Sequence, residues 1–210
     1  MSLLLPIDPL SPGPEVLTRV ASALRQGRVV AYPTETLYGL GVDPFREEAL
    51  ERLYVLKGRP AEMPISILVR DTAMLQEVAH HLSGPAVRLI EAFLPGPLTL
   101  VLPARPHVCQ RLTAGRCKVC IRISSHPLIG PLFASSPAPI TTTSANHKGQ
   151  PCARDARTVL SYFPEGLDCI LDTGTVPGGI GSTVVDVTGE APAILREGAI
   201  SARRISGALT

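Results

Sequence analysis

The sequence predicts a mixed α/β fold, because segments with helical spacing alternate with short apolar and β-branched runs along most of the chain. Such an alternation is typical of a sheet whose strands are joined by covering helices. A length of 210 residues with 45% apolar residues suits one domain with its own core. We expect an irregular arm at residues 1–14, the domain at 15–200 and a short tail at 201–210.

In the first half of the chain, glycine and proline mark the expected ends of the elements. Residues 15–25 have apolar side chains at helical spacing, and the apolar strand at 29–32 stops at Pro33. Residues 47–56 repeat the helical spacing and end before Gly58. The other expected elements of this half are a strand at 65–69, a helix at 82–93 and a strand at 98–102.

In the second half, the expected strands lead into polar segments. The strand at 119–123 carries Arg122 among apolar neighbours, and the β-branched strand at 140–143 continues into Ser144-Ala145-Asn146. Ligands of such sheets bind beyond the strand ends, where the polar loops gather. The other expected elements are helices at 127–134 and 155–162 and strands at 169–172, 183–187 and 193–196.

Composition and motifs argue against several classes of function. A net charge of +2 is too small for nucleic-acid binding over the whole surface, although a local basic patch stays open. Cys117 and Cys120 form a single C-x-x-C without the second pair of a structural zinc site, so we expect reduced thiols and no metal. The chain has no P-loop, Rossmann glycine pattern or histidine triad. With neither a signal peptide nor an apolar run of about 20 residues, we expect a cytoplasmic protein that does not bind membranes.

The sharpest candidates for a binding site are charged residues beside predicted turns. Lys57 and Arg59 flank the glycine that ends a predicted helix. They suit phosphate oxygens, although cations at a helix C-terminus also interact well with the helix dipole. Because a buried arginine is costly without a partner, Arg122 either clamps a carboxylate or phosphate or belongs to a structural ion pair.

Hydroxyl and amide groups accompany these cations. Ser144 and Asn146 follow a strand whose threonines are explained by their β propensity alone. The glycine-rich run at 177–183 either lets backbone amides converge on an anion or forms a flexible hairpin. Arg196 ends the last predicted strand and is either a ligand contact or a solvated side chain. Positioning and charge neutralisation suit this set better than strong acid–base chemistry.

Several motifs occur in a characteristic joint order along the chain: Pro33-Thr34-Glu35-Thr36, Tyr38-Gly39-Leu40-Gly41, Lys57-Gly58-Arg59-Pro60, Pro95-Gly96-Pro97-Leu98-Thr99, Arg122, Thr143-Ser144-Ala145-Asn146 and Ser182-Thr183-Val184-Val185-Asp186. From about residue 15 to 200, the chain resembles the YrdC-like family of threonylcarbamoyl-AMP synthases. The family's signature is K-x-R followed much later by S-x-N. The resemblance implies a twisted mixed α/β sheet with flanking helices and a concave, basic cleft, in the short single-domain form.

The resemblance also implies a reaction. L-Threonine, bicarbonate or CO2, and ATP with Mg²⁺ would give threonylcarbamoyl-adenylate and pyrophosphate, and a partner complex would transfer the threonylcarbamoyl group to tRNA. Matching positions imply catalytic roles for Lys57 and Arg59. They imply a threonine site of Thr36, Arg122, Thr142 and Ser182, and a nucleotide site of Lys57, Arg59, Ser144, Asn146 and Arg196.

This chain departs from the longer family members at two positions. Leu68 stands where they often carry a histidine, and Met63 stands where an asparagine is common. Two other functions stay open. One is a module that binds double-stranded RNA or tRNA through the cleft without synthase activity. The other is the carbamoyl chemistry of hydrogenase-maturation carbamoyltransferases, although their chains are longer and contain zinc-finger-like segments absent from this sequence.

Overall fold

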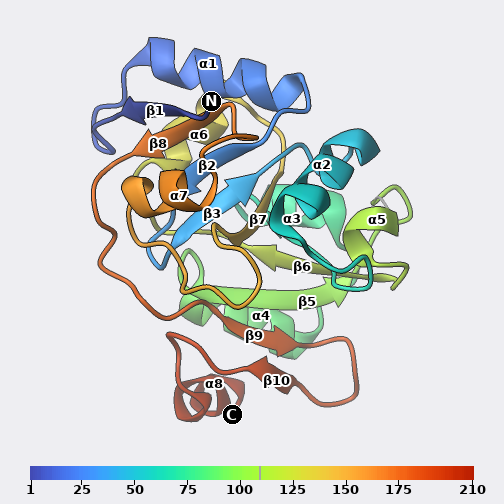
Figure 1. Ribbon diagram of the computed structural model, residues 1–210. Coiled ribbons are helices and arrows are strands. Elements are labelled where there is room, and N and C mark those ends of the chain that lie inside the picture. The colour runs from blue at the N-terminus through green and yellow to red at the C-terminus, as the bar shows by residue number, and fades with distance from the viewer. Residues whose placement is uncertain (109) are drawn as a thin grey trace.

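A mixed sheet of ten strands runs through the computed structural model, which describes residues 1–108 and 110–210 (Figure 1). The strands are β1 Leu3–Pro6, β2 Val30–Pro33, β3 Tyr38–Gly41, β4 Ser66–Leu68, β5 Leu98–Pro103, β6 Lys118–Arg122, β7 Ile140–Ser144, β8 Cys169–Asp172, β9 Thr183–Asp186 and β10 Ala193–Arg196. Their order in the sheet is β1-β8-β2-β3-β7-β4-β6-β5-β9-β10. Parallel and antiparallel pairs are mixed: β4 and β6 are parallel, for example, whereas β4 and β7 are antiparallel.

The helices cover the sheet and occupy its ends. They are α1 Pro14–Arg25, α2 Glu47–Lys57, α3 Thr72–Val78, α4 Gly84–Phe93, α5 Gln110–Thr113, α6 Ile129–Ser135, α7 Ala156–Tyr162 and α8 Ala202–Leu209. Polar side chains begin four of them by accepting a hydrogen bond from a backbone N–H of the first turn. These N-cap residues are Asp71, Ser83, Asp155 and Ser201.

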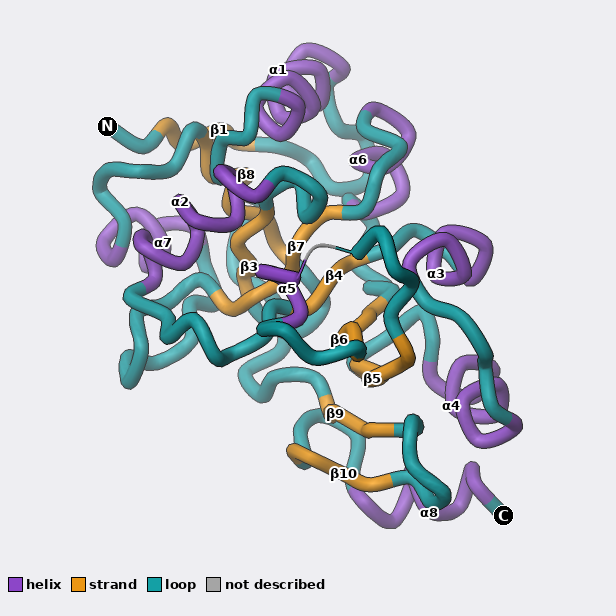
Figure 2. The backbone as a smooth tube through the Cα atoms, turned by 90° about the vertical axis from the view of Figure 1, so that its right-hand side faces the viewer, coloured by secondary structure: helices purple, strands orange, loops and turns teal. Residues whose placement is uncertain are grey.

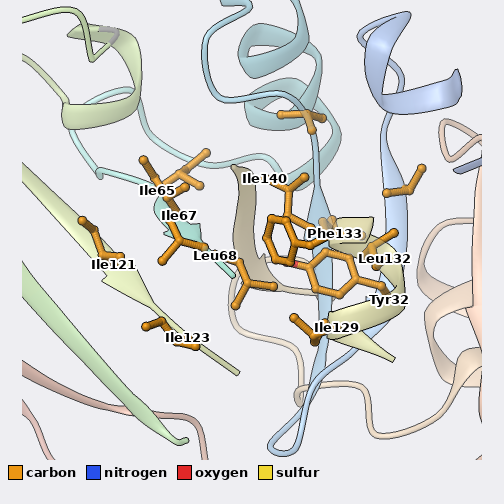
Figure 3. Packing of buried hydrophobic residues seen from close by; sticks show 14 of the residues in the cluster. Tyr32, Ile65, Ile67, Leu68, Ile121, Ile123, Ile129, Leu132, Phe133 and Ile140 are labelled. Carbon is orange, nitrogen blue, oxygen red and sulfur yellow. The ribbon is translucent and has the colours of Figure 1, made fainter. Parts of the chain in front are cut away.

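The core packs inner strands of the sheet against α6. Figure 3 shows Ile129, Leu132 and Phe133 of this helix beside Tyr32, Leu68 and Ile140 of the strands. Each of the six side chains is at most 3% exposed. Leu68 therefore belongs to the core, and the position where longer family members often carry a histidine is filled by an apolar side chain.

The strands β9 and β10 form an antiparallel hairpin at one end of the sheet. Figures 1 and 2 show α8 beside this hairpin, near the C-terminus, with α4 as its neighbour. At the other end of the sheet, the short strand β1 pairs with β8 in parallel. Within the described ranges, no helix is both long and apolar enough to cross a membrane.

Every helix and strand expected from the sequence is present, and the fold class is confirmed. The sequence interpretation missed α3, α5 and β3. The expectation of an irregular arm was wrong for Leu3–Pro6, because the four residues of this segment pair in parallel with Cys169–Asp172 and form an edge strand. Much of the expected tail at 201–210 is the helix α8, whose Ile205 is buried.

Candidate functional site

A cavity of about 310 Å³ opens on the polar part of the sheet, a volume within the range of about 300–1,000 Å³ that small-molecule pockets have. The strands β3, β4, β5, β6 and β7 contribute to its wall, together with the β2–β3 turn and the loops before β9 and after β10. Seven of the nine predicted site residues line it: Thr36, Arg59, Arg122, Thr142, Ser144, Ser182 and Arg196. Lys57 and Asn146 are not among the lining residues.

Strand register explains why these polar groups share one side of the sheet. Ser66 of β4 pairs with Thr142 of β7, and Leu68 of β4 pairs with Arg122 of β6. Because side chains alternate along a strand, all four of these residues face the same side. This side is apolar at Leu68, beneath α6, and becomes polar toward Ser66 and Thr142, where the cavity lies.

The β2–β3 turn is built by its own threonines. The hydroxyl of Thr34 donates to the backbone oxygen of Leu37 at 2.7 Å and accepts from the backbone N–H groups of Thr36 and Leu37. It also lies 3.0 Å from the hydroxyl of Thr36. A local side-chain bond of this kind fixes a tight turn. Thr36 is thus held with its hydroxyl toward the cavity wall.

Arg122 reaches this turn from the middle of the sheet. Its Nη2 donates to the Thr36 hydroxyl at 2.8 Å and lies 2.9 Å from Oε1 of Glu35, with which it forms an ion pair. The residue is 6% exposed, and its Nε is buried without a hydrogen-bond partner in the described chain. Of the two interpretations of Arg122 from the sequence, the structural ion pair is confirmed, and a role toward a ligand stays a prediction.

Lys57 ends α2 and lies behind the cavity wall. Its Nζ donates to the backbone oxygens of Ser144 and Asn146, the second at 2.9 Å, so the ammonium group holds the turn that follows β7. Burial, together with the nearby positive charge of Arg59, lowers the pKa of Lys57 to about 8. Lys57 thus contributes charge to the site from beneath Ser144.

Arg59 follows Gly58, whose φ of +59° gives the left-handed conformation that ends α2. Its guanidinium donates to the backbone oxygens of Met63 at 3.2 Å and Pro64 at 2.6 Å. Burial also lowers the pKa of Arg59, although an arginine stays charged at neutral pH. The side chain of Met63 is itself 43% exposed, so this residue serves the site through its carbonyl oxygen.

The turn after β7 orders the two polar residues of the S-x-N motif. The hydroxyl of Ser144 donates to Oδ1 of Asn146 at 2.6 Å, and Nδ2 of Asn146 donates to the backbone oxygen of Gln150 at 2.7 Å. Ser144 reaches the cavity, whereas Asn146 supports the turn beside it.

The glycine-rich loop closes the far wall of the cavity. Gly178 packs against the β2–β3 turn so closely that a Cβ there would lie 2.2 Å from the backbone oxygen of Thr36. At its end, the hydroxyl of Ser182 lies 2.8 Å from that of Thr99, and Arg196 donates to the backbone oxygen of Ser182 at 2.8 Å. Close packing therefore explains Gly178, while Gly181 lines the cavity.

The sequence interpretation missed several residues of the site. Ser66, Thr99 and Cys152 line the cavity, and Glu35 pairs with Arg122 from outside the lining. Alternation along the strands could have indicated Ser66 and Thr99. The pairing of Glu35 with Arg122 had no local signal, because 87 positions separate the two along the chain.

Metal ligands are scarce around the cavity. Within the described ranges, no group of three or more His, Cys, Asp or Glu residues could hold a metal ion. Cys117 is exposed and Cys120 is partly buried, and Cys109 lies outside the described residues. Among the described lining residues, the acidic side chain is Glu197.

Comparisons with known proteins agree with this architecture. A family model named for Sua5, YciO and YrdC, and described as Telomere recombination, matches residues 22–198. A threonylcarbamoyl-AMP synthase of Pyrococcus abyssi is 38% identical over 185 residues, which are 88% of this chain and 54% of that protein. One of Bacillus subtilis is 35% identical over 203 residues, which are 96% of this chain and 59% of that protein.

The solved structure of P. abyssi Sua5 complexed with L-threonine superposes with a TM-score of 0.95 at 34% identity, covering 99% of this chain and 61% of that one. This chain therefore spans little more than half the length of these relatives. The match includes the whole sheet and every strand that borders the cavity.

Proposed function

Because this chain belongs to the Sua5/YciO/YrdC family, we propose that its cavity condenses L-threonine, bicarbonate or CO2, and ATP into threonylcarbamoyl-adenylate, with release of pyrophosphate. The observation that carries the proposal is the buried Arg122, which lines the cavity and is held there by Thr36 and Glu35. An α-carboxylate is the complementary group, because arginine binds carboxylates through strong, charge-assisted hydrogen bonds.

The amino acid would bind at the end of the cavity that Arg122 forms with the β2–β3 turn. Its carboxylate would accept from Arg122, and the hydroxyls of Thr36, Thr142 and Ser182 would contact its polar groups. The first and last of these hydroxyls are held by protein partners, Arg122 and Thr99. A site ordered before binding loses little entropy when the substrate arrives.

The nucleotide would bind toward the other cations. Arg59 and Arg196 line the cavity, and Lys57 adds charge from beneath Ser144. Ser144 and Asn146 would hold the nucleotide at the turn after β7. Lys57 and Arg59 would stabilise the charge that develops on the phosphates as the bond to pyrophosphate breaks.

The chemistry needs little from the protein beyond placement. The threonine amine captures CO2 as a carbamate, a carbamate oxygen attacks the α-phosphorus, and pyrophosphate leaves. No described carboxylate–histidine pair lines the cavity, and positioned cations suit this in-line transfer. Mg²⁺ would arrive with the phosphates of ATP and keep much of its water shell, with Glu197 as the nearest acidic group that the described lining offers.

The proposal extends to a cytoplasmic role in tRNA modification, in which a partner complex transfers the threonylcarbamoyl group to tRNA. Both first relatives are named threonylcarbamoyl-AMP synthase, which supports the first half-reaction most directly. The competing proposal is an RNA-binding module without synthase activity. The net charge of +2 does not favour it, because binding of RNA through a broad surface usually needs a larger excess of basic residues.

The decisive experiment measures pyrophosphate release by the purified 210-residue chain with ATP, Mg²⁺ and bicarbonate, with and without L-threonine. We expect release that requires both threonine and bicarbonate, and a product with the mass of threonylcarbamoyl-adenylate. Release that ignores threonine would contradict the assignment of the amino acid. No release with intact RNA binding would favour the binding module.

A further inference from the structure

The positive charges around the cavity are of two kinds. Arg122 has a carboxylate partner, Glu35, at 2.9 Å. In the described chain, Lys57, Arg59 and Arg196 instead donate to neutral oxygen atoms of the backbone. Of these cations, Arg122 is therefore paired with a carboxylate, whereas Lys57, Arg59 and Arg196 form no ion pair within the described chain.

Glu35 is placed to act on Arg122 and on nothing in the cavity itself. It does not belong to the described lining, and its Oε2 accepts from the hydroxyl of Ser124. That hydroxyl is buried and also accepts from the backbone N–H of His126. The carboxylate is thus fixed from behind by β6 and the segment after it, with Oε1 directed at the guanidinium group.

We propose that Glu35 is a positioning residue that makes the Arg122 end selective for an amino-acid zwitterion and keeps phosphate groups out of it. The inference rests on the proposed function and adds a reason why the threonine carboxylate and the phosphates of ATP bind at different places in one cavity. Glu35 balances the charge of Arg122 at the cavity, because its carboxylate pairs with the guanidinium group.

The electrostatic reason is a difference in net charge between the threonine zwitterion and a phosphate group. A zwitterion brings an ammonium group with its carboxylate, so it adds no net charge beside Glu35. A phosphate group brings between one and two negative charges and would lie near the Glu35 carboxylate beside the buried Arg122, where repulsion is weakly screened. Lys57 and Arg59, which form no ion pair within the described chain, offer phosphate a better place.

The proposal predicts how threonine and phosphate compete. Titration calorimetry with L-threonine is carried out in the absence and presence of inorganic phosphate, on the unaltered chain and on the Glu35→Gln variant. In the unaltered chain, phosphate should leave the Kd for threonine within about twofold. In Glu35→Gln, phosphate should bind at Arg122 and raise the apparent Kd for threonine by about tenfold.

Two matched variants separate charge from structure. Glu51→Gln breaks another arginine pair, the one that Glu51 forms with Arg111 at 2.7 Å on an exposed part of α2, and should behave like the unaltered chain. Glu35→Asp keeps the charge and should restore insensitivity to phosphate. A purely structural Glu35 would lower Tm in Glu35→Gln without creating competition by phosphate, and that result would overturn the proposal.

The test also works if Glu35→Gln does not fold. Competition between phosphate and threonine in the unaltered chain would by itself overturn the proposal. If the unaltered chain binds no threonine, the proposed function fails. The inference is then judged by direct titration with phosphate, in which Glu35→Gln should gain a phosphate site that the unaltered chain and Glu35→Asp lack.

Discussion

At the scale of single residues, Arg122 carries the most information about the site. Its Nη2 is used by Thr36 and Glu35, so the guanidinium plane is fixed before any ligand binds. We expect Arg122→Lys to raise the Kd for L-threonine by about tenfold to a hundredfold, because an ammonium group cannot keep both protein contacts and still bind a carboxylate as the planar guanidinium does. Titration calorimetry with threonine and, separately, with ATP measures the effect.

The Kd for ATP should change by no more than about twofold in that variant, since Lys57 and Arg59 lie at the other end of the cavity. Arg70→Lys is the matched control, because Arg70 forms an exposed pair with Asp71 at 2.7 Å. Equal losses of threonine and ATP affinity in Arg122→Lys would mean that the two sites are not separated as proposed.

Lys57 gives the site a predicted pH dependence. Its pKa lies near 8, below the usual value for lysine, because the side chain is buried and Arg59 adds positive charge nearby. The ammonium form is complete well below pH 8 and is lost as the pH rises through that value. ATP affinity should therefore fall between about pH 7 and pH 9, and Lys57→Arg should remove this dependence because arginine stays charged.

Fluorescence titration with a nucleotide analogue across this pH range measures the dependence of ATP affinity. A flat profile for the unaltered chain would show that the charge of Lys57 does not contribute to nucleotide binding. The residue would then act through its hydrogen bonds to Ser144 and Asn146 alone.

The residues that lie at the cavity could be predicted from the sequence, but the hydrogen bonds that hold them there could not. Thr36, Arg122 and Ser182 were all expected at one site, and all three line the cavity. The place of Lys57 behind the wall depends on backbone oxygen atoms 87 and 89 positions away, which no local pattern encodes. Family resemblance identified the residue, and only the fold shows that it reaches the site through the turn after β7.

At the scale of elements, the glycine-rich loop before β9 makes a testable contact. We expect Gly178→Ala to push the loop away from the β2–β3 turn, because the added Cβ would lie 2.2 Å from the backbone oxygen of Thr36. Overpacking of this kind costs about 1–3 kcal/mol, and the displaced Thr36 should also weaken threonine binding. Thermal unfolding and titration calorimetry measure the two effects.

Gly179→Ala is the matched control one residue along. The nearest atoms to its added Cβ belong to Arg154 and lie 4.0 Å away, so this variant should bind threonine like the unaltered chain. Similar effects of the two substitutions would mean that loop flexibility matters more than the contact with Thr36.

The strand β1 shows why short edge elements escape prediction from sequence. Leu3–Pro6 is four residues long and ends in proline, so its composition favours an irregular arm. Its pairing with β8 is supported by Ser2, whose hydroxyl donates to the backbone oxygen of Phe163 at 2.8 Å. Contacts more than 150 positions apart cannot be inferred from the spacing of nearby residues.

Ser2→Ala should therefore destabilise the fold by about 1 kcal/mol, the usual contribution of one buried hydrogen bond. Chemical denaturation, monitored by far-UV circular dichroism, measures the loss. Ser11→Ala, at an exposed position in the segment between β1 and α1, is expected to be neutral. If both variants unfold at the same denaturant concentration as the unaltered chain, β1 does not depend on this bond.

At the scale of the whole molecule, the sheet brings distant loops to one cavity through an order that the sequence does not contain. Strands β4 and β7 are neighbours in the sheet although α3 to α6 lie between them in the chain. The turn after β2, the strand β6 and the loop before β9 thus meet at Arg122, Thr36 and Gly178. Local patterns predicted 13 of the 18 elements in the described chain, whereas their order in the sheet depends on long-range pairing.

The size of the cavity and the net charge of the molecule also favour small-molecule substrates over an RNA duplex. The cavity of about 310 Å³ has the size of a small-molecule site, while 20 basic and 18 acidic residues leave the chain with a charge of only +2. An RNA duplex needs many phosphate contacts over a broad surface, so its binding would be weak and strongly dependent on salt. Arg59 is one of the residues that line the cavity.

Arg59→Ala should consequently weaken ATP binding by about tenfold and leave the affinity for double-stranded RNA unchanged within about twofold. Filter binding across a series of salt concentrations measures RNA affinity, and titration calorimetry measures ATP affinity on the same preparation. Circular dichroism checks that the variant is still folded, because the substitution removes the hydrogen bonds of Arg59 to the backbone oxygens of Met63 and Pro64. If RNA and ATP affinity fell together, the cavity would be part of an RNA surface, and the binding module would become the better description of this chain.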